Sequence, residues 1–253
     1  MIERVDDDGV AVVRLAHGPV NALDLDLLGA ITDTFRDLDH GDHTAVVLTG
    51  TGKAFCAGVD LWRIVESGQG YVEEFLPALV AAFEAVFTTG KPVVAALNGH
   101  AIAGGCIFAA ACDRRIMAAG RGRIGVSEML VGVPFPAAAL QILRYAVGEQ
   151  MQRDLILSGA THEPAEALRR GLVDEVMPAD QVLDHALETA RRLGTLIPPD
   201  TFRLTKSQLR LDTIERIARD WPAERAEVTR LWSARVADGW IRGYMERVTK
   251  RSA

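Results

Sequence analysis

The chain has 253 residues, of which 49% are hydrophobic and 25% charged, and this is the composition of a globular protein with a sizeable core. Its net charge of −6 and its scattered lysines and arginines argue against a nucleic-acid surface, because phosphate backbones are bound by clustered basic side chains. The N-terminus lacks the pattern of a signal peptide, and the most apolar stretch, residues 101–112, is shorter than the roughly 20 residues of a membrane span, so we expect a cytoplasmic protein with neither a membrane nor a nucleic-acid partner.

The first two-thirds of the chain alternates predicted strands with predicted helices. Residues 10–15, 45–49 and 92–97 are rich in β-branched or small apolar residues and predict buried strands. Residues 28–38 and 71–89 repeat apolar side chains every three or four positions, which predicts two amphipathic helices. Such alternation is typical of an α/β fold.

The last third of the chain is predicted to be helical. Strand signals nearly vanish after Pro134, and the pair Pro198-Pro199 resembles a hinge. We therefore divide the chain into an α/β body of residues 1–197 and a helical region of residues 198–253. The helices predicted before the hinge cover residues 136–147, 149–157, 164–170 and 179–196.

The three cysteines, Cys56, Cys106 and Cys112, form no CxxC pair and stand in apolar segments. Their odd number fits reduced thiols in a cytosol better than a disulfide framework or a zinc site. A nucleophilic thiol would need a partnered base, and none is evident. We expect three buried core side chains and no metal site.

Three common catalytic or nucleotide-binding motifs are absent or incomplete. The turn Gly50–Ala54 is similar to a phosphate-binding loop, but Val47 stands where the first glycine of that loop belongs and Ala54 replaces its Ser or Thr. The chain contains neither the GxGxxG of dinucleotide-binding folds nor the GxSxG of serine hydrolases. Mononucleotide binding, dinucleotide binding and serine hydrolysis therefore have little support.

Two glycine-containing turns remain, at residues 55–61 and 103–106, and each is predicted to connect a strand to a helix. The simpler interpretation is that the glycines only permit tight turns. The functional interpretation is that backbone N–H groups at the two helix starts converge on one carbonyl oxygen and stabilise an oxyanion. One such donor is worth on the order of 3 kcal/mol of the reaction barrier. The pair of turns is far more specific for such a site than either turn alone.

Several segments resemble the crotonase (enoyl-CoA hydratase/isomerase) superfamily in order and spacing, across nearly the whole chain. The resemblance implies a spiral of repeating ββα units with a C-terminal helical trimerisation region, assembled as a homotrimer or a dimer of trimers. It also implies an acyl-CoA thioester substrate in fatty acid β-oxidation, with coenzyme A as part of the substrate and no separate cofactor. The matching segments are residues 19–23, 55–61, 98–106, 111–113 and 164–176.

The resemblance also assigns roles to particular residues. The thioester oxygen would be held between the backbone amides of Val59 and Gly104. The family often has Ala at the first of these positions, and since the N–H group does the work, we expect the role to survive in a narrower pocket. The coenzyme A portion would lie along two segments, whose residues are Asn21, Ala22 and Leu23, and Ala57, Gly58, Asp60 and Leu61.

Other polar residues near these motifs have simpler interpretations. His100 precedes the second turn and is expected to be structural, and Asp60 and Asp113 are expected to cap or brace turns. Candidates for the coenzyme A phosphates are Lys53, Arg63 and Lys250, although for any one of them a charge on a solvated face is the plainer interpretation.

Glu128 is the catalytic candidate. Hydratases of the family use two glutamates, and the first of them would occupy the position of Ile107. The second belongs in residues 124–128, where Glu128 stands. Taken alone, Glu128 would be interpreted as a solvated acid in the first turn of a helix capped by Ser127. Together with the surrounding motifs it becomes a general base beside an apolar wall, which should raise its pKa.

One carboxylate beside an apolar residue suits a double-bond shift. A single base removes a proton from C2 of a 3-enoyl thioester and returns it at C4, whereas hydration needs an activated water. The sequence further resembles the 3,2-trans-enoyl-CoA isomerase branch at Pro19–Leu23, Ala103–Cys106 and Leu204-Thr205-Lys206. The alternatives are an enoyl-CoA hydratase (a lyase) or other thioester enolate chemistry, and a non-catalytic acyl-CoA-binding protein.

Overall fold

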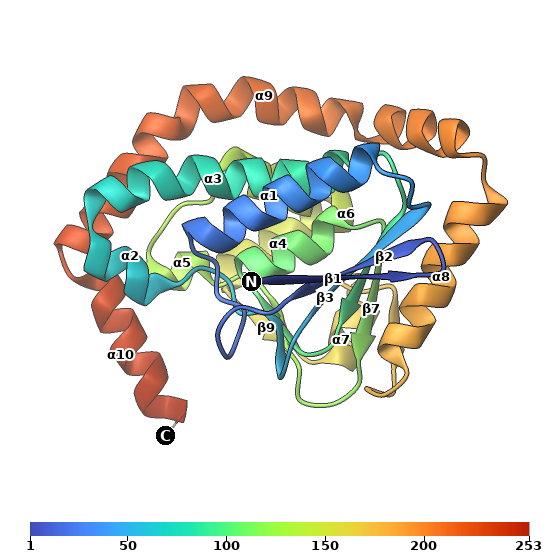
Figure 1. Ribbon diagram of the computed structural model, residues 1–253. Helices are drawn as coiled ribbons and strands as arrows, with labels where there is room; N and C mark the ends of the chain where they lie inside the picture. Colours follow the sequence, from blue (N-terminus) through green and yellow to red (C-terminus); the bar gives the residue numbers. More distant parts are fainter. Residues whose placement is uncertain (253) are drawn as a thin grey trace.

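Two β-sheets form the framework of the fold, and helices cover them (Figure 1). The structure is a computed structural model that describes the backbone of residues 1–252 and the side chains of residues 1–248. The larger sheet has the strand order β1-β2-β3-β5-β7-β10, in which β1 and β2 are antiparallel and the other neighbours are parallel. Its strands are β1 Ile2–Asp7, β2 Val10–Leu15, β3 Ala45–Gly50, β5 Val93–Leu97, β7 Arg114–Ala118 and β10 Glu175–Met177.

The smaller sheet has the strand order β4-β6-β8-β9, with β4, β6 and β8 parallel to one another. From β3 to β8, consecutive strands therefore enter the larger and the smaller sheet in turn, and helix follows each pair, as in a spiral of ββα units. The strands of this sheet are β4 Ala54–Cys56, β6 His100–Ile102, β8 Ile124–Gly125 and β9 Thr161–His162.

Helices surround both sheets. The part of the chain that the structure describes contains α1 Leu25–His40, α2 Leu61–Ser67, α3 Gln69–Thr88, α4 Gly104–Ala111, α5 Glu128–Val131, α6 Ala137–Ser158, α7 Pro164–Arg169, α8 Val182–Leu196, α9 Pro199–Ala237 and α10 Trp240–Ser252. None of the described helices is long and apolar enough to cross a membrane.

Alternation of side chains along the strands of the larger sheet produces two cores. Val10 and Val12 of β2 face α8, where they join buried residues of β3, β5 and β7. Ala11, Val13 and Leu15 of the same strand face the opposite side and belong to the main core beneath α1, α3 and α4. This arrangement follows from the period of two in a strand and from a parallel sheet that is covered on both faces.

The C-terminal helices lie across the body. In Figure 1, α9 arches over α1 and α3, and α10 runs down beside α2. The indole Nε1 of Trp232 in α9 donates to the Pro134 carbonyl at 3.0 Å. Asp113, at the start of β7, accepts from Lys206 at 2.6 Å and from Arg210 at 2.7 Å, so the expectation that Asp113 braces the fold is confirmed.

The predicted α/β spiral with a C-terminal helical region is confirmed. Strand signals were predicted nearly to vanish after Pro134, and within the described residues the strands beyond it are the short β9 and β10. Helix α6, Ala137–Ser158, is interrupted at Gly148, whose φ of 77° and ψ of 163° are not helical, and this agrees with the two helices predicted over residues 136–147 and 149–157. The division at residues 197/198 stays a prediction, although α8 ends at Leu196 and α9 begins at Pro199.

Candidate active site

The smaller sheet brings three predicted site residues to one edge. Its strands β4, β6 and β8 run parallel, so their C-terminal ends meet on the same side. Val59 follows the end of β4 by three residues, Gly104 follows the end of β6 by two, and Glu128 follows the end of β8 by three. The parallel pairing of these strands therefore brings Val59, Gly104 and Glu128, which are far apart in the sequence, to the same edge of the smaller sheet.

The two glycine turns are in direct contact. Gly58 has a φ of +84°, and a Cβ added there would lie 2.8 Å from the Ile102 carbonyl oxygen and 3.5 Å from the Gly104 nitrogen. A Cβ on Gly105 would lie 2.1 Å from the Cys56 carbonyl oxygen. Only glycine fits at positions 58 and 105, because real Cβ atoms do not approach backbone so closely. The glycines thus allow the two turns to pack backbone against backbone.

Within the part of the chain that the structure describes, the backbone N–H groups of Val59 and Gly104 donate no hydrogen bond to the surrounding backbone. Val59 and Leu23 form an isolated parallel bridge. The two hydrogen bonds of this bridge run from the Leu23 N–H to the Gly58 oxygen and from the Asp60 N–H to the Leu23 oxygen, so the bridge does not use the Val59 N–H. Gly104 is the first residue of α4, where an N–H group has no intrahelical partner. Both groups therefore have the capacity to bind an external oxygen.

The peptide before Gly104 is held in an uncommon conformation. Ala103 has a φ of 51° and a ψ of −120°, a region that costs a side-chain-bearing residue about 1–3 kcal/mol. Hydrogen bonds fix it on both sides, from the Ala103 N–H to the Gly125 oxygen at 2.8 Å and from the Ile107 N–H to the Ala103 oxygen at 3.2 Å. The orientation of the Gly104 N–H is thereby determined by β8 and α4 together.

Asn21 connects the predicted coenzyme A segment to the first turn. Its buried side chain accepts from the His17 N–H at 2.9 Å, and its amide nitrogen donates to the carbonyl oxygens of Ala54 at 3.0 Å and Phe55 at 3.2 Å. The side chain is thus occupied in bracing the loop. A further bond runs from the Ala57 N–H to the Val20 oxygen at 3.0 Å.

The structure brings the predicted coenzyme A residues together as two adjacent strips of chain. The strip of Asn21, Ala22 and Leu23 lies beside that of Ala57, Gly58, Asp60 and Leu61. Asp60 caps α2, since its Oδ1 accepts from the Arg63 N–H at 3.0 Å, which confirms its predicted capping role. The side chain of Lys250 lies outside the described residues.

Glu128 is the buried acid of the site. The residue as a whole retains partial exposure, but its Oε2 is inaccessible to solvent and has no hydrogen-bond partner among the described residues. Burial raises the pKa of Glu128 to about 7, and backbone N–H groups of Ser127 and Glu128 offset part of that effect. Ser127 makes no side-chain capping bond. The interpretation of Glu128 as a solvated, Ser-capped acid is therefore wrong.

The neighbours of Glu128 on α4 are uncharged. Ile107, which stands where a second glutamate was considered, is fully buried one turn after Gly104. Cys106 is close enough for the Glu128 charge to affect it, and burial raises the pKa of Cys106 to about 12. Burial likewise raises the pKa of Cys56 and Cys112 to about 12, so all three thiols are neutral core groups, as predicted.

A polar cluster around Asp24, which the sequence motifs did not predict, lies next to the strip of residues 21–23. Asp24 caps α1 through the Leu27 N–H and is 2% exposed; its Oδ2 lies 2.8 Å from His17 Nε2 and 3.5 Å from Arg63 Nη1. Burial raises the pKa of Asp24, but these bonds outweigh burial and leave it below its usual range. The hydroxyl of Tyr71 accepts from the Leu25 N–H at 3.1 Å. Asp24 stands before an apolar helical repeat, a recognisable capping signal.

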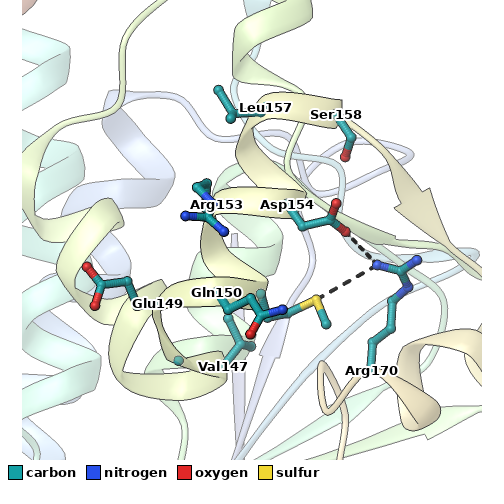
Figure 2. Close-up of a pocket in the computed structure, with 10 residues that line it drawn as sticks. Val147, Glu149, Gln150, Arg153, Asp154, Leu157, Ser158 and Arg170 are labelled. Carbon is teal, nitrogen blue, oxygen red and sulfur yellow. Dashed lines mark hydrogen bonds and ion pairs between the residues drawn. The ribbon is translucent and has the colours of Figure 1, made fainter.

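An open cavity of about 930 Å³ lies at the bend of α6, outside this site (Figure 2). Asp154 and Met151 of α6 contact Arg170 across it, at 2.6 Å and 3.9 Å. None of the three residues Val59, Gly104 and Glu128 lines it. Within the described residues there is also no cluster of three or more His, Cys, Asp or Glu side chains suited to a metal ion.

Known proteins share both the fold and the sequence. The solved structure of human mitochondrial delta3-delta2-enoyl-CoA isomerase matches with a TM-score of 0.89 and 27% identity, covering 100% of this chain and 99% of that one. Enoyl-CoA delta isomerase 1 of Rattus norvegicus is 29% identical over 99% of this chain and 88% of its own length. A putative enoyl-CoA hydratase of Thermus thermophilus is 41% identical over 81% of this chain and 82% of its own.

The spiral architecture is therefore that of the crotonase fold, as the sequence predicted. A family model described as enoyl-CoA hydratase/isomerase matches residues 6–249. The chain belongs to the enoyl-CoA hydratase/isomerase family and is an enzyme of that class.

Proposed function

We propose that the chain is an enoyl-CoA isomerase that converts a 3-enoyl-CoA to the 2-trans-enoyl-CoA. The observation that carries the proposal is a single buried carboxyl, that of Glu128, at the same sheet edge as two backbone N–H groups that have no partner among the described residues, with Ile rather than Glu at position 107 of α4. The similarity to isomerases from rat and human supports the same assignment.

In the proposed reaction, the thioester oxygen accepts hydrogen bonds from the N–H groups of Val59 and Gly104. Ionised Glu128 takes a proton from C2, and the C2–H electron pair delocalises into the thioester to give a dienolate. The negative charge then resides largely on the oxygen held by the two amides, where fixed donors need no reorganisation. Glu128 returns the proton to C4, and the double bond finally lies between C2 and C3.

The environment of Glu128 suits this proton transfer. A general base works best when its pKa is near the working pH, because it then accepts and returns a proton with similar ease. Burial raises the pKa of Glu128 to about 7, which meets that condition. Position 107 holds a fully buried isoleucine and so provides no second carboxylate to activate a water molecule, and this disfavours hydration.

The direct test is incubation of the purified protein with a 3-enoyl-CoA, followed by the ultraviolet absorbance of the conjugated thioester. Glu128→Gln should lower the rate by about 10²–10⁴-fold, the usual contribution of a general base. The matched control is Glu74→Gln, which removes an exposed carboxylate from α3 and should leave the rate unchanged. Equal rates for wild type and Glu128→Gln would rule out the proposed base.

Hydration is the second candidate, because the relative from Thermus thermophilus is named a putative enoyl-CoA hydratase. Formation of 3-hydroxyacyl-CoA from a 2-enoyl-CoA, at a rate above that of isomerisation, would select it. Tight acyl-CoA binding without turnover of any thioester would instead indicate a binding protein.

We also infer that the chain assembles as a homotrimer or a dimer of trimers. Three leucines of α9, Leu204, Leu209 and Leu211, are 60%, 66% and 50% exposed, an apolar surface that self-association would cover. Light scattering coupled to size-exclusion chromatography tests this directly, and a monomer at micromolar concentration would contradict it.

A further inference from the structure

The helix α10 contacts two elements that lie next to the proposed reacting groups. One is α5, which begins at Glu128, and the other is α2, which begins two residues after Val59 (Figure 1). Ile241 of α10 is fully buried and belongs to the main core, so the helix is anchored to the body. One helix therefore joins the segment of the proposed base to the segment of one proposed oxyanion donor.

Trp240, the first residue of α10, packs on the glycine that ends α5. Gly132 has a φ of +88°, and a Cβ added there would lie 2.5 Å from Nε1 and 2.6 Å from Cδ1 of the Trp240 indole. The indole therefore lies against the backbone of Gly132. The start of α10 is itself fixed, because the Trp240 N–H donates to Asp238 Oδ1 at 2.9 Å.

Trp232 of α9 holds the same segment two residues further on. Its Nε1 donates to the Pro134 carbonyl at 3.0 Å, and its side chain is 2% exposed. Its ring also lies 6.5 Å from that of Phe75 in α3. The two C-terminal helices thus contribute one indole each, and we call Trp232 and Trp240 the tryptophan clamp. It fixes residues 132–134 at both ends.

The clamped segment determines the backbone position of Glu128. The Glu128 carbonyl accepts from the Gly132 N–H at 2.9 Å and from the Val133 N–H at 3.1 Å. The helix α5 has only four residues, and so short a helix is not stable by itself. The orientation of Glu128 therefore depends on these two bonds and on the side chains that pack on the turn.

The same helix α10 also contacts the start of α2. The guanidinium of Arg242 lies 6.0 Å from the centroid of the Trp62 ring, within the range of a cation–π contact. Trp62 follows Val59 by three residues. The position of α10 is thereby linked to the turn that presents the first proposed oxyanion donor.

From these contacts we infer that Trp240 is a positioning residue, which through Gly132 holds the proposed base Glu128 in place for proton transfer. The inference rests on the proposed isomerase function. In that reaction the base must reach both C2 and C4 of an acyl group whose oxygen is fixed by the amides of Val59 and Gly104. A misplacement of about 1 Å costs on the order of 10²-fold in rate, so a contact four residues from the base is close enough to matter.

The first test measures kcat and KM of the full-length protein with a 3-enoyl-CoA. Trp240→Ala should lower kcat about tenfold and change KM by less than about twofold, because it displaces the base and leaves the predicted coenzyme A segments in place. Trp240→Phe keeps an aromatic ring on Gly132 and should recover most of the rate. The matched control is Leu196→Ala, which removes a large apolar side chain that is 75% exposed at the end of α8 and should leave kcat unchanged.

A double-mutant cycle shows whether the effect passes through Gly132. Gly132→Ala should lower kcat in the wild type, because its Cβ would meet the Trp240 indole, and it should have a several-fold smaller effect in the Trp240→Ala background. The strain of a side chain at positive φ is the same in both backgrounds and cancels. An equal effect of Gly132→Ala in the two backgrounds would overturn the inference.

Hydrogen–deuterium exchange followed by mass spectrometry tests the contact without a substrate. The amides of residues 128–133 should exchange faster in Trp240→Ala than in the wild type, and at the wild-type rate in Leu196→Ala. A wild type that does not isomerise a 3-enoyl-CoA would refute the proposed function, while the exchange rates still decide whether Trp240 holds the segment. Unchanged exchange in Trp240→Ala, or an unchanged kcat of this variant beside an active wild type, would contradict the positioning role.

Discussion

Replacement of Glu128 by glutamine should raise the stability of the protein in a pH-dependent manner while it lowers turnover by about 10²–10⁴-fold. The ordinary pKa of a glutamate is 4.5, and burial raises that of Glu128 to about 7 in the folded state. Between these two values the folded protein binds the proton more tightly than the unfolded chain does. Stability therefore falls as the pH rises from about 4.5 to about 7, and the penalty is fully developed above pH 7.

The magnitude follows from linkage. A shift from 4.5 to about 7 corresponds to about 3 kcal/mol above pH 7, since one pKa unit is about 1.4 kcal/mol. At pH 5 the same shift costs only about 1 kcal/mol. Glutamine has nearly the same shape but does not ionise. The difference in unfolding free energy between Glu128→Gln and wild type should thus change by about 2–3 kcal/mol in favour of the variant from pH 5 to pH 8.

Urea unfolding at pH 5, 6, 7 and 8 measures this difference by linear extrapolation, at one protein concentration so that any oligomerisation contributes equally. Glu74→Gln is the matched control, because it replaces an exposed carboxylate of α3 by the same amide. A constant difference for Glu128→Gln across the same range would refute the reasoning that the Glu128 carboxyl is desolvated. The fixed cost of burying an amide shifts all four values together and leaves the slope intact.

Four further outcomes are expected. The rate constant kcat/KM for isomerisation should fall about tenfold per pH unit below pH 7, as the Glu128 base becomes protonated; a flat profile from pH 5 to 8 would contradict this. Gly58→Ala should destabilise the protein by more than about 2 kcal/mol in urea unfolding and lower kcat, because its Cβ would meet the Ile102 oxygen at 2.8 Å; a stable, fully active variant would show that the turns can separate. Ala103→Gly should stabilise by up to about 1 kcal/mol by relief of its positive φ, whereas a loss of stability would mean that Ala103 is unstrained. Asp113→Asn should cost about 3–5 kcal/mol, because it leaves two buried cations without a carboxylate, and a loss below 1 kcal/mol would show that they are solvated.

Local sequence patterns were sufficient to predict the strands and helices that bury a whole face in the core. The strands β2, β3 and β5 and the helices α1 and α3 lie close to their predicted positions, since β-branched runs and apolar repeats determine them directly. The strand β10 could not be predicted in the same way. Its three residues are only partly buried, and they form a strand because β7 pairs with them.

The candidate site likewise combines features that the sequence predicts with features that depend on tertiary contacts. The sequence by itself determined which residues are present: two glycine turns, one glutamate in a favourable segment, and an isoleucine where a second glutamate was considered. Only the tertiary structure decided that the turns touch at Gly58 and Gly104, and that the Oε2 of Glu128 is buried with no partner among the described residues. The physical reason is that contact and desolvation depend on parallel pairing among β4, β6 and β8, which joins residues separated by dozens of positions, and no local pattern encodes the environment that this pairing creates.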